Sequence, residues 1–278
     1  MNTNVTIHPI RIDFHVTEQI ERYVFVYLIE AGACYLIDSG VAGSEAQIAQ
    51  YMKSIGRDLS EVRAVFLTHA HPDHIGTAAW LREHTGSRIY ASQGERGWIE
   101  DIDQQYRQRP IPGFYRLAGR SVPVDVAVRG GDIVPLEEGL SIEVIAAPGH
   151  SIDGVSYRLG DALFLGDAVP VKGDIPIYID RDAAVRTLQT IGALEGIRHD
   201  HPAWDRTYQQ AEIREKLADA MSAIRTMEEQ VRAILAEGGA TDVAALTELV
   251  CRRLDMPQLR ANPLFQRTVA AHRPVGEG

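Results

Sequence analysis

The sequence contains little cysteine and no long apolar run. Its two cysteines, Cys34 and Cys251, are too few for a disulfide framework, so we expect a reducing compartment, the cytoplasm. The N-terminus, MNTNVTIHPI, lacks the basic stretch and apolar core of a signal peptide. No segment approaches the roughly 18 apolar residues of a membrane-spanning helix. We therefore expect a soluble, cytoplasmic protein that does not contact the membrane.

Basic residues are also scarce. The 28 Lys and Arg residues are outnumbered by 38 Asp and Glu residues, which gives a formal net charge of -10. Nucleic-acid backbones are held mainly by Lys and Arg, so this balance disfavours a nucleic-acid partner. A small-molecule substrate is the expectation that remains.

The apolar pattern predicts two sets of strands, each followed by a helix. Three antiparallel strands are expected in residues 5–40, and a helix that ends near Gly56 follows them. The other expected elements are strands at 63–67, 141–147, 154–159 and 162–167, a helix from about Asp73 to Gly86, and a helix at 181–194. Residues 101–125 are polar and rich in Pro and Gly, and we expect an irregular insertion or lid there.

From residue 206 onward the composition changes to helix-forming residues. We therefore predict two domains, a catalytic domain over 1–205 and a C-terminal helical extension over 206–278. The amphipathic helices of the extension could pair two subunits in a homodimer or cover the active site.

A cluster of metal-binding residue types lies on the loop between the strand at 63–67 and the next helix. In the run HAHPDH, three imidazoles and one carboxylate fall within six residues: His69, His71, Asp73 and His74. Such nitrogen and oxygen donors suit a borderline divalent metal. In an extended loop His69 and His71 point to one side and can share an ion. Asp73 and His74 can then face a second ion, whereas the simpler alternative is a polar loop rich in histidine.

Two further residues lie at the ends of apolar strands. His150 occurs in PGHS after the strand at 141–147, and Asp167 occurs in LGDA after the strand at 162–167. Each alone would indicate an ordinary surface histidine or a Gly-Asp turn. Together with the HAHPDH run, both become candidate metal ligands.

HAHPDH, PGHS and LGDA, in this order and spacing, resemble the metallo-β-lactamase superfamily over roughly residues 5–205. The resemblance implies an α/β fold, a four-layer αββα sandwich with two divalent metal ions, most often zinc, with iron or manganese as alternatives. By position, the implied ligands are His69, His71 and His150 for the first ion, Asp73 and His74 for the second, and Asp167 as the bridge. Asp38 in LIDSG matches an early aspartate that supports the site, although it could equally be a turn residue.

The sequence departs from the family pattern at the last ligand. The resemblance implies a Gly-His pair after the helix at 181–194, but the region reads EGIRHDHPAWDRTY, and Trp204 falls near the expected position. His199, His201 and His272 are the remaining candidates for a seventh ligand, and each could instead be an ordinary loop or terminal residue.

The predicted activity is hydrolysis of an ester, lactone or thioester by a metal-bound hydroxide, as in the glyoxalase II-type and lactonase members that the chain resembles. Asp73 is the candidate catalytic residue that orients the hydroxide, and Tyr178 is either an oxyanion donor or a packed aromatic. An incomplete second metal site would also suit a mononuclear iron persulfide dioxygenase. A non-catalytic scaffold with a vestigial site is the third alternative.

Overall fold

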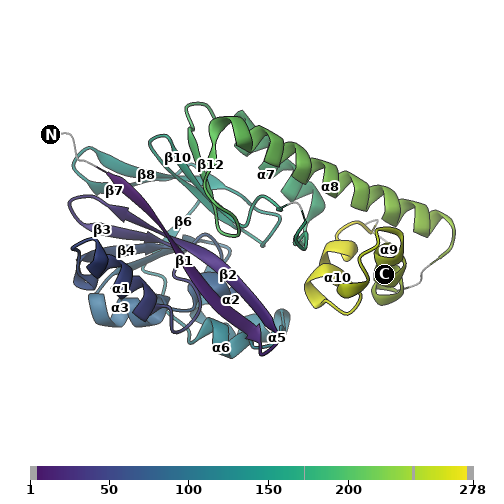
Figure 1. Ribbon diagram of the computed structural model, residues 1–278, viewed down its shortest axis with the longest axis horizontal. Coiled ribbons are helices and arrows are strands. Elements are labelled where there is room, and N and C mark those ends of the chain that lie inside the picture. The colour runs from purple at the N-terminus through teal and green to yellow at the C-terminus, as the bar shows by residue number, and fades with distance from the viewer. Residues whose placement is uncertain (1–4, 172, 240–241, 274–278) are drawn as a thin grey trace.

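The computed structural model describes residues 5–171, 173–239 and 242–273 and contains two six-stranded sheets (Figure 1). The first sheet has the strand order β1 (Thr6–Thr17), β2 (Ile20–Glu30), β3 (Cys34–Ile37), β4 (Val62–Phe66), β5 (Arg88–Ser92) and β6 (Val126–Val128). The second has the order β12 (Tyr208–Gln209), β11 (His199–Pro202), β10 (Ala162–Gly166), β9 (Val155–Leu159), β8 (Leu140–Ala146) and β7 (Ile133–Glu137). The three N-terminal strands pair antiparallel, as the sequence predicts.

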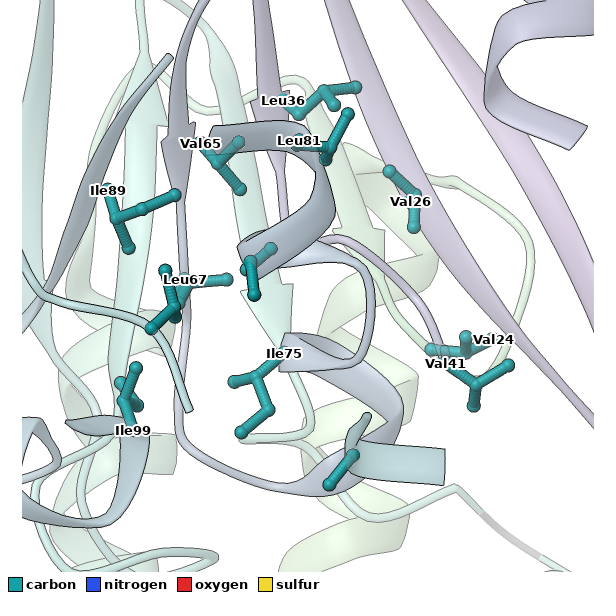
Figure 2. Packing of buried hydrophobic residues seen from close by; sticks show 14 of the residues in the cluster. Val24, Val26, Leu36, Val41, Val65, Leu67, Ile75, Leu81, Ile89 and Ile99 are labelled. Atoms are coloured by element: carbon teal, nitrogen blue, oxygen red, sulfur yellow. The ribbon is translucent and has the colours of Figure 1, made fainter. Parts of the chain in front are cut away.

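The core has the layers of an αββα sandwich. Alternate residues of one strand face opposite sides of a sheet. On β2, Tyr27 and Ile29 therefore pack against the second sheet, whereas Val26 and Leu28 pack under the helices. Figure 2 shows this helix-facing cluster, in which residues of β3, β4 and β5 lie against Leu81. The predicted four-layer architecture is confirmed.

The helix expected from Asp73 to Gly86 is interrupted. It consists of α2 (Pro72–Ile75) and α3 (Ala78–Thr85), and Gly86 ends the second helix with φ 72°. The break falls at Gly76, whose amide donates to the Gly40 carbonyl, 2.8 Å away, and so leaves the helical pattern. The local sequence does not indicate this contact with a distant residue.

The expectation of an irregular segment at 101–125 is wrong in part. The chain there forms α5 (Ile102–Gln108) and α6 (Phe114–Ala118), preceded by α4 (Arg96–Glu100). These helices are too short for a 3.6-residue period to emerge from the sequence. Capping still marks one of them, because the Asp101 side chain accepts a hydrogen bond from the Gln104 amide.

The remaining helices are α1 (Glu45–Ser54), α7 (Arg181–Ala193), α8 (Gln210–Ala236), α9 (Val243–Arg253) and α10 (Pro263–Ala270), with short 3-10 turns at Leu59–Glu61 and Pro257–Leu259. The first half of α8 packs with α7 on the second sheet. Its second half extends beyond the sandwich and packs with α9 and α10 (Figure 1). The domain boundary at residue 205 stays a prediction, because α8 contributes to both clusters. None of the described helices is long and apolar enough to span a bilayer.

Candidate metal centre

Three loops that follow buried strands bring the candidate ligands together. His69 and His71 lie on the loop after β4, His150 follows β8, and Asp167 follows β10. His71 is the N-cap of α2, and Pro72 at the first helical position fixes the turn that places His74 one turn further. Residues from both sheets thus meet at one edge of the sandwich.

A first group of four side chains could hold one ion. One donor atom from each of His69, His71, His150 and Asp167 lies within 4.8 Å of all the others. His71 Nδ1 is 2.9 Å from His69 Nε2 and 2.9 Å from His150 Nε2. His150 Nε2 is also 3.3 Å from Asp167 Oδ2. Three imidazole nitrogens and a carboxylate oxygen around one point fit a divalent cation.

A second group shares Asp167 with the first. Donor atoms of Asp73, His74 and Asp167 also lie within 4.8 Å of one another. His74 Nε2 is 3.3 Å from Asp167 Oδ1 and 3.6 Å from Asp73 Oδ2. Because the two oxygens of Asp167 face different groups, the carboxylate lies between these groups, where the family resemblance implies a bridge.

The hydrogen bonds at the far side of each ring fix its orientation. His150 Nδ1 donates to the Ile177 carbonyl at 2.9 Å, and His74 Nδ1 lies 2.8 Å from Asp38 Oδ2. His69 Nδ1 lies 3.0 Å from the hydroxyl of Thr68, which itself donates to Asp38. With Nδ1 engaged, these rings direct Nε2 toward the cluster. Asp38 therefore positions the site, which supports the first of its two interpretations.

Burial and charge set the protonation of the cluster. Burial lowers the pKa of His69 and His71 well below the ordinary value and also lowers that of His150, which keeps lone pairs free for a metal. Burial opposes charge on His74, but Asp167, Asp38 and Asp73 raise its pKa well above the ordinary value. A proton on His74 partly neutralises these three carboxylates. A bound cation would neutralise the same carboxylates.

Trp204 contacts the bridging carboxylate directly. Its indole Nε1 donates to Asp167 Oδ2 over 2.7 Å. Of the three candidates for a seventh ligand, His201 lies 2.9 Å from the Thr207 hydroxyl and stacks on Phe164. Neither it nor His199 nor His272 belongs to a potential metal-binding group among the described residues. The position of the seventh ligand, which the sequence left unassigned, is therefore occupied by the Trp204 indole, next to Asp167.

Tyr178 is a packed aromatic. Its ring is buried against the second sheet and α7, and its hydroxyl lies 2.7 Å from His272 Nε2. This contact joins the segment before α7 to the residues after α10, and it accounts for the burial of His272. The oxyanion role that the sequence left open gains no support from this placement.

Sequence reasoning missed three polar residues beside the metal loop. Buried Glu95 accepts hydrogen bonds from the amides of Ala70 and Asp153, and the Gln105 side-chain amide donates to the Ala70 carbonyl. Arg109, directly after α5, is 4% exposed, and burial lowers the pKa of its guanidinium to about 10. Polar residues on short surface helices carry no signal in the sequence that separates them from solvated ones.

A cavity of about 420 Å3 opens beside the cluster. His71, Asp73 and Asp167 form part of one wall, and apolar side chains cover most of the rest. The other walls come from the β1–β2 hairpin, the chain from 109 to 117, residues 169–171 and 174–177, and the C-terminal residues 258–264. The volume falls in the range of roughly 300–1,000 Å3 that small-molecule sites occupy.

The sequence matches the family model described as the metallo-beta-lactamase superfamily over residues 20–221. A hydroxyacylglutathione hydrolase from Thiobacillus denitrificans is 36% identical over 128 residues, which are 46% of this chain and 40% of that protein. A hydroxyacylglutathione hydrolase from Methylococcus capsulatus is 26% identical over 247 residues, 85% of each chain. The chain spans about half the length of several curated relatives, from 40% to 64%.

Solved structures share the fold at low identity. A metallo-beta-lactamase family protein from Thermus thermophilus has a TM-score of 0.75 at 19% identity, over 96% of this chain and 91% of that chain. A class B3 di-zinc metallo-beta-lactamase from an Alaskan soil metagenome has a TM-score of 0.60 at 17% identity, over 73% and 90%. At such identities the likeness concerns the fold alone.

Proposed function

Because the chain belongs to the metallo-beta-lactamase superfamily, we propose that it is a metal-dependent hydrolase that cleaves an ester, lactone or thioester bond of a small-molecule substrate. The observation that carries this proposal is the convergence of six metal-binding side chains at the wall of an apolar cavity. A substrate in that cavity would have its reacting carbonyl beside the cluster.

The proposed ligands are His69, His71 and His150 for a first ion, Asp73 and His74 for a second, and Asp167 between them. Divalent ions bound there would lower the pKa of a coordinated water toward neutrality and polarise a carbonyl oxygen. The donor set of imidazoles and carboxylates suits zinc, and iron and manganese are the alternatives.

Asp73 is the proposed catalytic residue. Its side chain is 16% exposed and lines the cavity. Burial raises the pKa of this carboxyl, which makes it a better proton acceptor. By accepting a hydrogen bond from the attacking water, Asp73 would orient that water toward the substrate carbonyl and then take its proton.

The names of the relatives add one bond type, the thioester, to those that the cavity suits. Two of the matched proteins carry the name hydroxyacylglutathione hydrolase, so a thioester is one substrate class to test. The mostly apolar lining of the cavity suits esters and lactones with a hydrocarbon body equally well. All three bond types present a carbonyl carbon to the same cluster.

The contact of Trp204 with Asp167 favours one second candidate. If the second group fails to retain an ion, the remaining site of three histidines and Asp167 would suit a mononuclear iron persulfide dioxygenase. Metal analysis discriminates between the two functions. One iron per chain, with oxygen consumption in the presence of glutathione persulfide, would overturn the hydrolase proposal.

The direct test combines metal content with turnover on a panel of esters, lactones and thioesters. His71→Ala and Asp167→Ala should each lose bound metal and at least about a hundredfold in kcat/KM. His84→Ala is the matched control, because His84 is exposed on α3. Unchanged metal and turnover in the two cluster variants would refute the catalytic role of the site.

A further inference from the structure

The buried guanidinium of Arg109 is not explained by metal binding or by hydrolysis. Arg109 is 4% exposed, and its Nη1 has no hydrogen-bond partner among the described residues. A buried charge that lacks hydrogen bonds destabilises a fold. The same side chain lines the cavity together with His71 and Asp73, so a ligand in the cavity can reach it.

Neighbouring elements hold Arg109 in place. It follows α5 directly, and its amide donates to the Gln105 carbonyl at 2.7 Å. The Gln105 side chain is bonded to Ala70 on the metal loop, and Arg267 of α10 donates to the Gln108 carbonyl. These contacts fix the backbone at Arg109 between the metal loop and the C-terminal helices before any ligand binds, and burial limits the freedom of its side chain, which lowers the entropic cost of binding.

We propose that Arg109 binds a carboxylate of the substrate, and that the substrate is an acyl compound with an apolar body and one negative charge near the scissile bond. This inference rests on the proposed hydrolase function and narrows it to a substrate class. The guanidinium fork matches a carboxylate with two parallel hydrogen bonds. The apolar lining from Phe14, Val169 and Leu264 fits a hydrocarbon chain or ring.

The surrounding charges favour a single negative charge over a phosphate dianion. Four charged groups act on Arg109: Asp73, Arg267, Asp167 and Glu95. Asp73 and Asp167 would be engaged by metal in the loaded enzyme, Glu95 accepts hydrogen bonds from two backbone amides, and Arg267 does not line the cavity. Arg22, the other arginine that lines the cavity, is 3.9 Å from Asp174 and partly exposed. One buried cation is thus available to the ligand.

Binding of octanoate and octanamide to the metal-loaded enzyme tests the proposal. The two probes share one shape and differ in charge, so the ratio of their Kd values, measured by calorimetry, isolates recognition of the carboxylate. We expect wild type to favour octanoate, and Arg109→Gln to reduce that preference by roughly tenfold or more. Arg109→Lys, which keeps the charge without the fork, should retain part of it.

Arg107→Gln is the control on α5, the helix that ends just before Arg109, because Arg107 is exposed, with 67% of its side chain accessible. It should leave the preference for octanoate unchanged. Equal preference in wild type, Arg109→Gln and Arg107→Gln, at equal metal content, would overturn the proposal and assign the carboxylate to the metal.

Turnover separates this proposal from the hydrolase assignment. Wild type should hydrolyse monoethyl hexylmalonate, whose carboxylate lies next to the ester, with a higher kcat/KM than diethyl hexylmalonate, and Arg109→Gln should remove the difference through KM. Hydrolysis of both esters with no effect of Arg109→Gln overturns the carboxylate site but keeps the hydrolase. Octanoate binding that depends on Arg109, without hydrolysis of any ester, thioester or lactone, keeps the site and refutes the hydrolase.

Discussion

The two groups of the metal cluster differ in their number of imidazoles, and the Trp204 indole lies beside the carboxylate that they share. Three imidazoles surround the first position, whereas Asp73, His74 and the shared Asp167 form the second. The Trp204 indole donates to the same Asp167 oxygen that lies beside His150. The second position has one imidazole against three in the first, and Trp204, whose indole cannot act as a metal ligand, lies where a seventh ligand is expected, so we expect the second ion to bind more weakly than the first.

Trp204→His should strengthen the second site. The substitution removes the indole donor and places an imidazole near Asp167, so we expect the affinity for a second zinc to rise about tenfold or more. Zinc per chain, measured after dialysis against a graded series of chelator concentrations, gives the result. Trp80→His, on α3, is the control. Identical zinc titrations for Trp204→His and wild type would contradict the expectation.

Asp200 on β11 makes stability depend on pH. Its side chain is buried, Oδ2 lacks a hydrogen-bond partner among the described residues, and burial raises the pKa of the carboxyl to about 6. Because the pKa is higher in the folded state, stability is present below the unfolded value, near 4, and declines as the pH rises toward 6.

Asp200→Asn should therefore remove part of the stability loss on going from pH 5 to pH 8. We expect the asparagine variant to gain about 1 kcal/mol relative to wild type between these two values, because its amide carries no charge to bury. Urea unfolding of both proteins at each pH measures the difference. Parallel pH dependence in the two proteins would mean that Asp200 stays charged in the fold.

At the scale of elements, the break between α2 and α3 falls at Gly76, two residues after the candidate ligand His74. It depends on a close approach of backbone at Gly76, where an added Cβ would lie 2.2 Å from the Ala42 amide nitrogen and 2.3 Å from the Leu117 carbonyl oxygen. Backbone atoms cannot move aside as a flexible side chain can. Three segments therefore meet at a position that only glycine fits: helix α6, the start of α3 and the loop that follows β3.

Gly76→Ala and Gly97→Ala form a matched pair. Gly76→Ala should lower the free energy of unfolding by at least about 2 kcal/mol, because the methyl group overlaps backbone. Gly97 lies in α4 with nothing within 4 Å of an added Cβ. Gly97→Ala should therefore raise stability by up to about 1 kcal/mol through helix propensity. Denaturant unfolding measures both changes, and equal stability of the two variants would refute the packing argument.

At the scale of the whole molecule, the metal cluster joins loops from both sheets. The loop after β4 belongs to the first sheet, and the loops after β8 and β10 belong to the second. A ligand that binds the folded state alone stabilises it in proportion to the logarithm of its concentration over Kd. Ions held between the sheets should therefore stabilise the entire sandwich.

Metal removal should lower the Tm by roughly 5 °C or more. This value assumes a free ion concentration of about 100 times Kd and a domain of this size. Thermal unfolding with and without a chelator, followed by circular dichroism, measures the shift. His71→Ala should unfold at a lower temperature and respond little to chelator, because it lacks a central ligand. A chelator shift of equal size in this variant would place the stabilising metal elsewhere.

The sequence by itself determined the features that depend on neighbouring residues. His69, His71, Asp73 and His74 fall within six residues after a buried strand, so local backbone geometry alone brings their side chains near one another. The resemblance carried by three short motifs predicted the family and the four-layer fold, and both are confirmed. The alternation of apolar residues was enough to predict the long strands.

Only the tertiary structure decided what lies beside those residues. Trp204 rather than His199, His201 or His272 reaches Asp167, because its position depends on how β11 pairs with β10. The buried Arg109 and the cavity arise where α5, the metal loop and the C-terminal helices meet. Contacts between residues far apart in the chain follow from the packing of every element together, and no local pattern of residues encodes them.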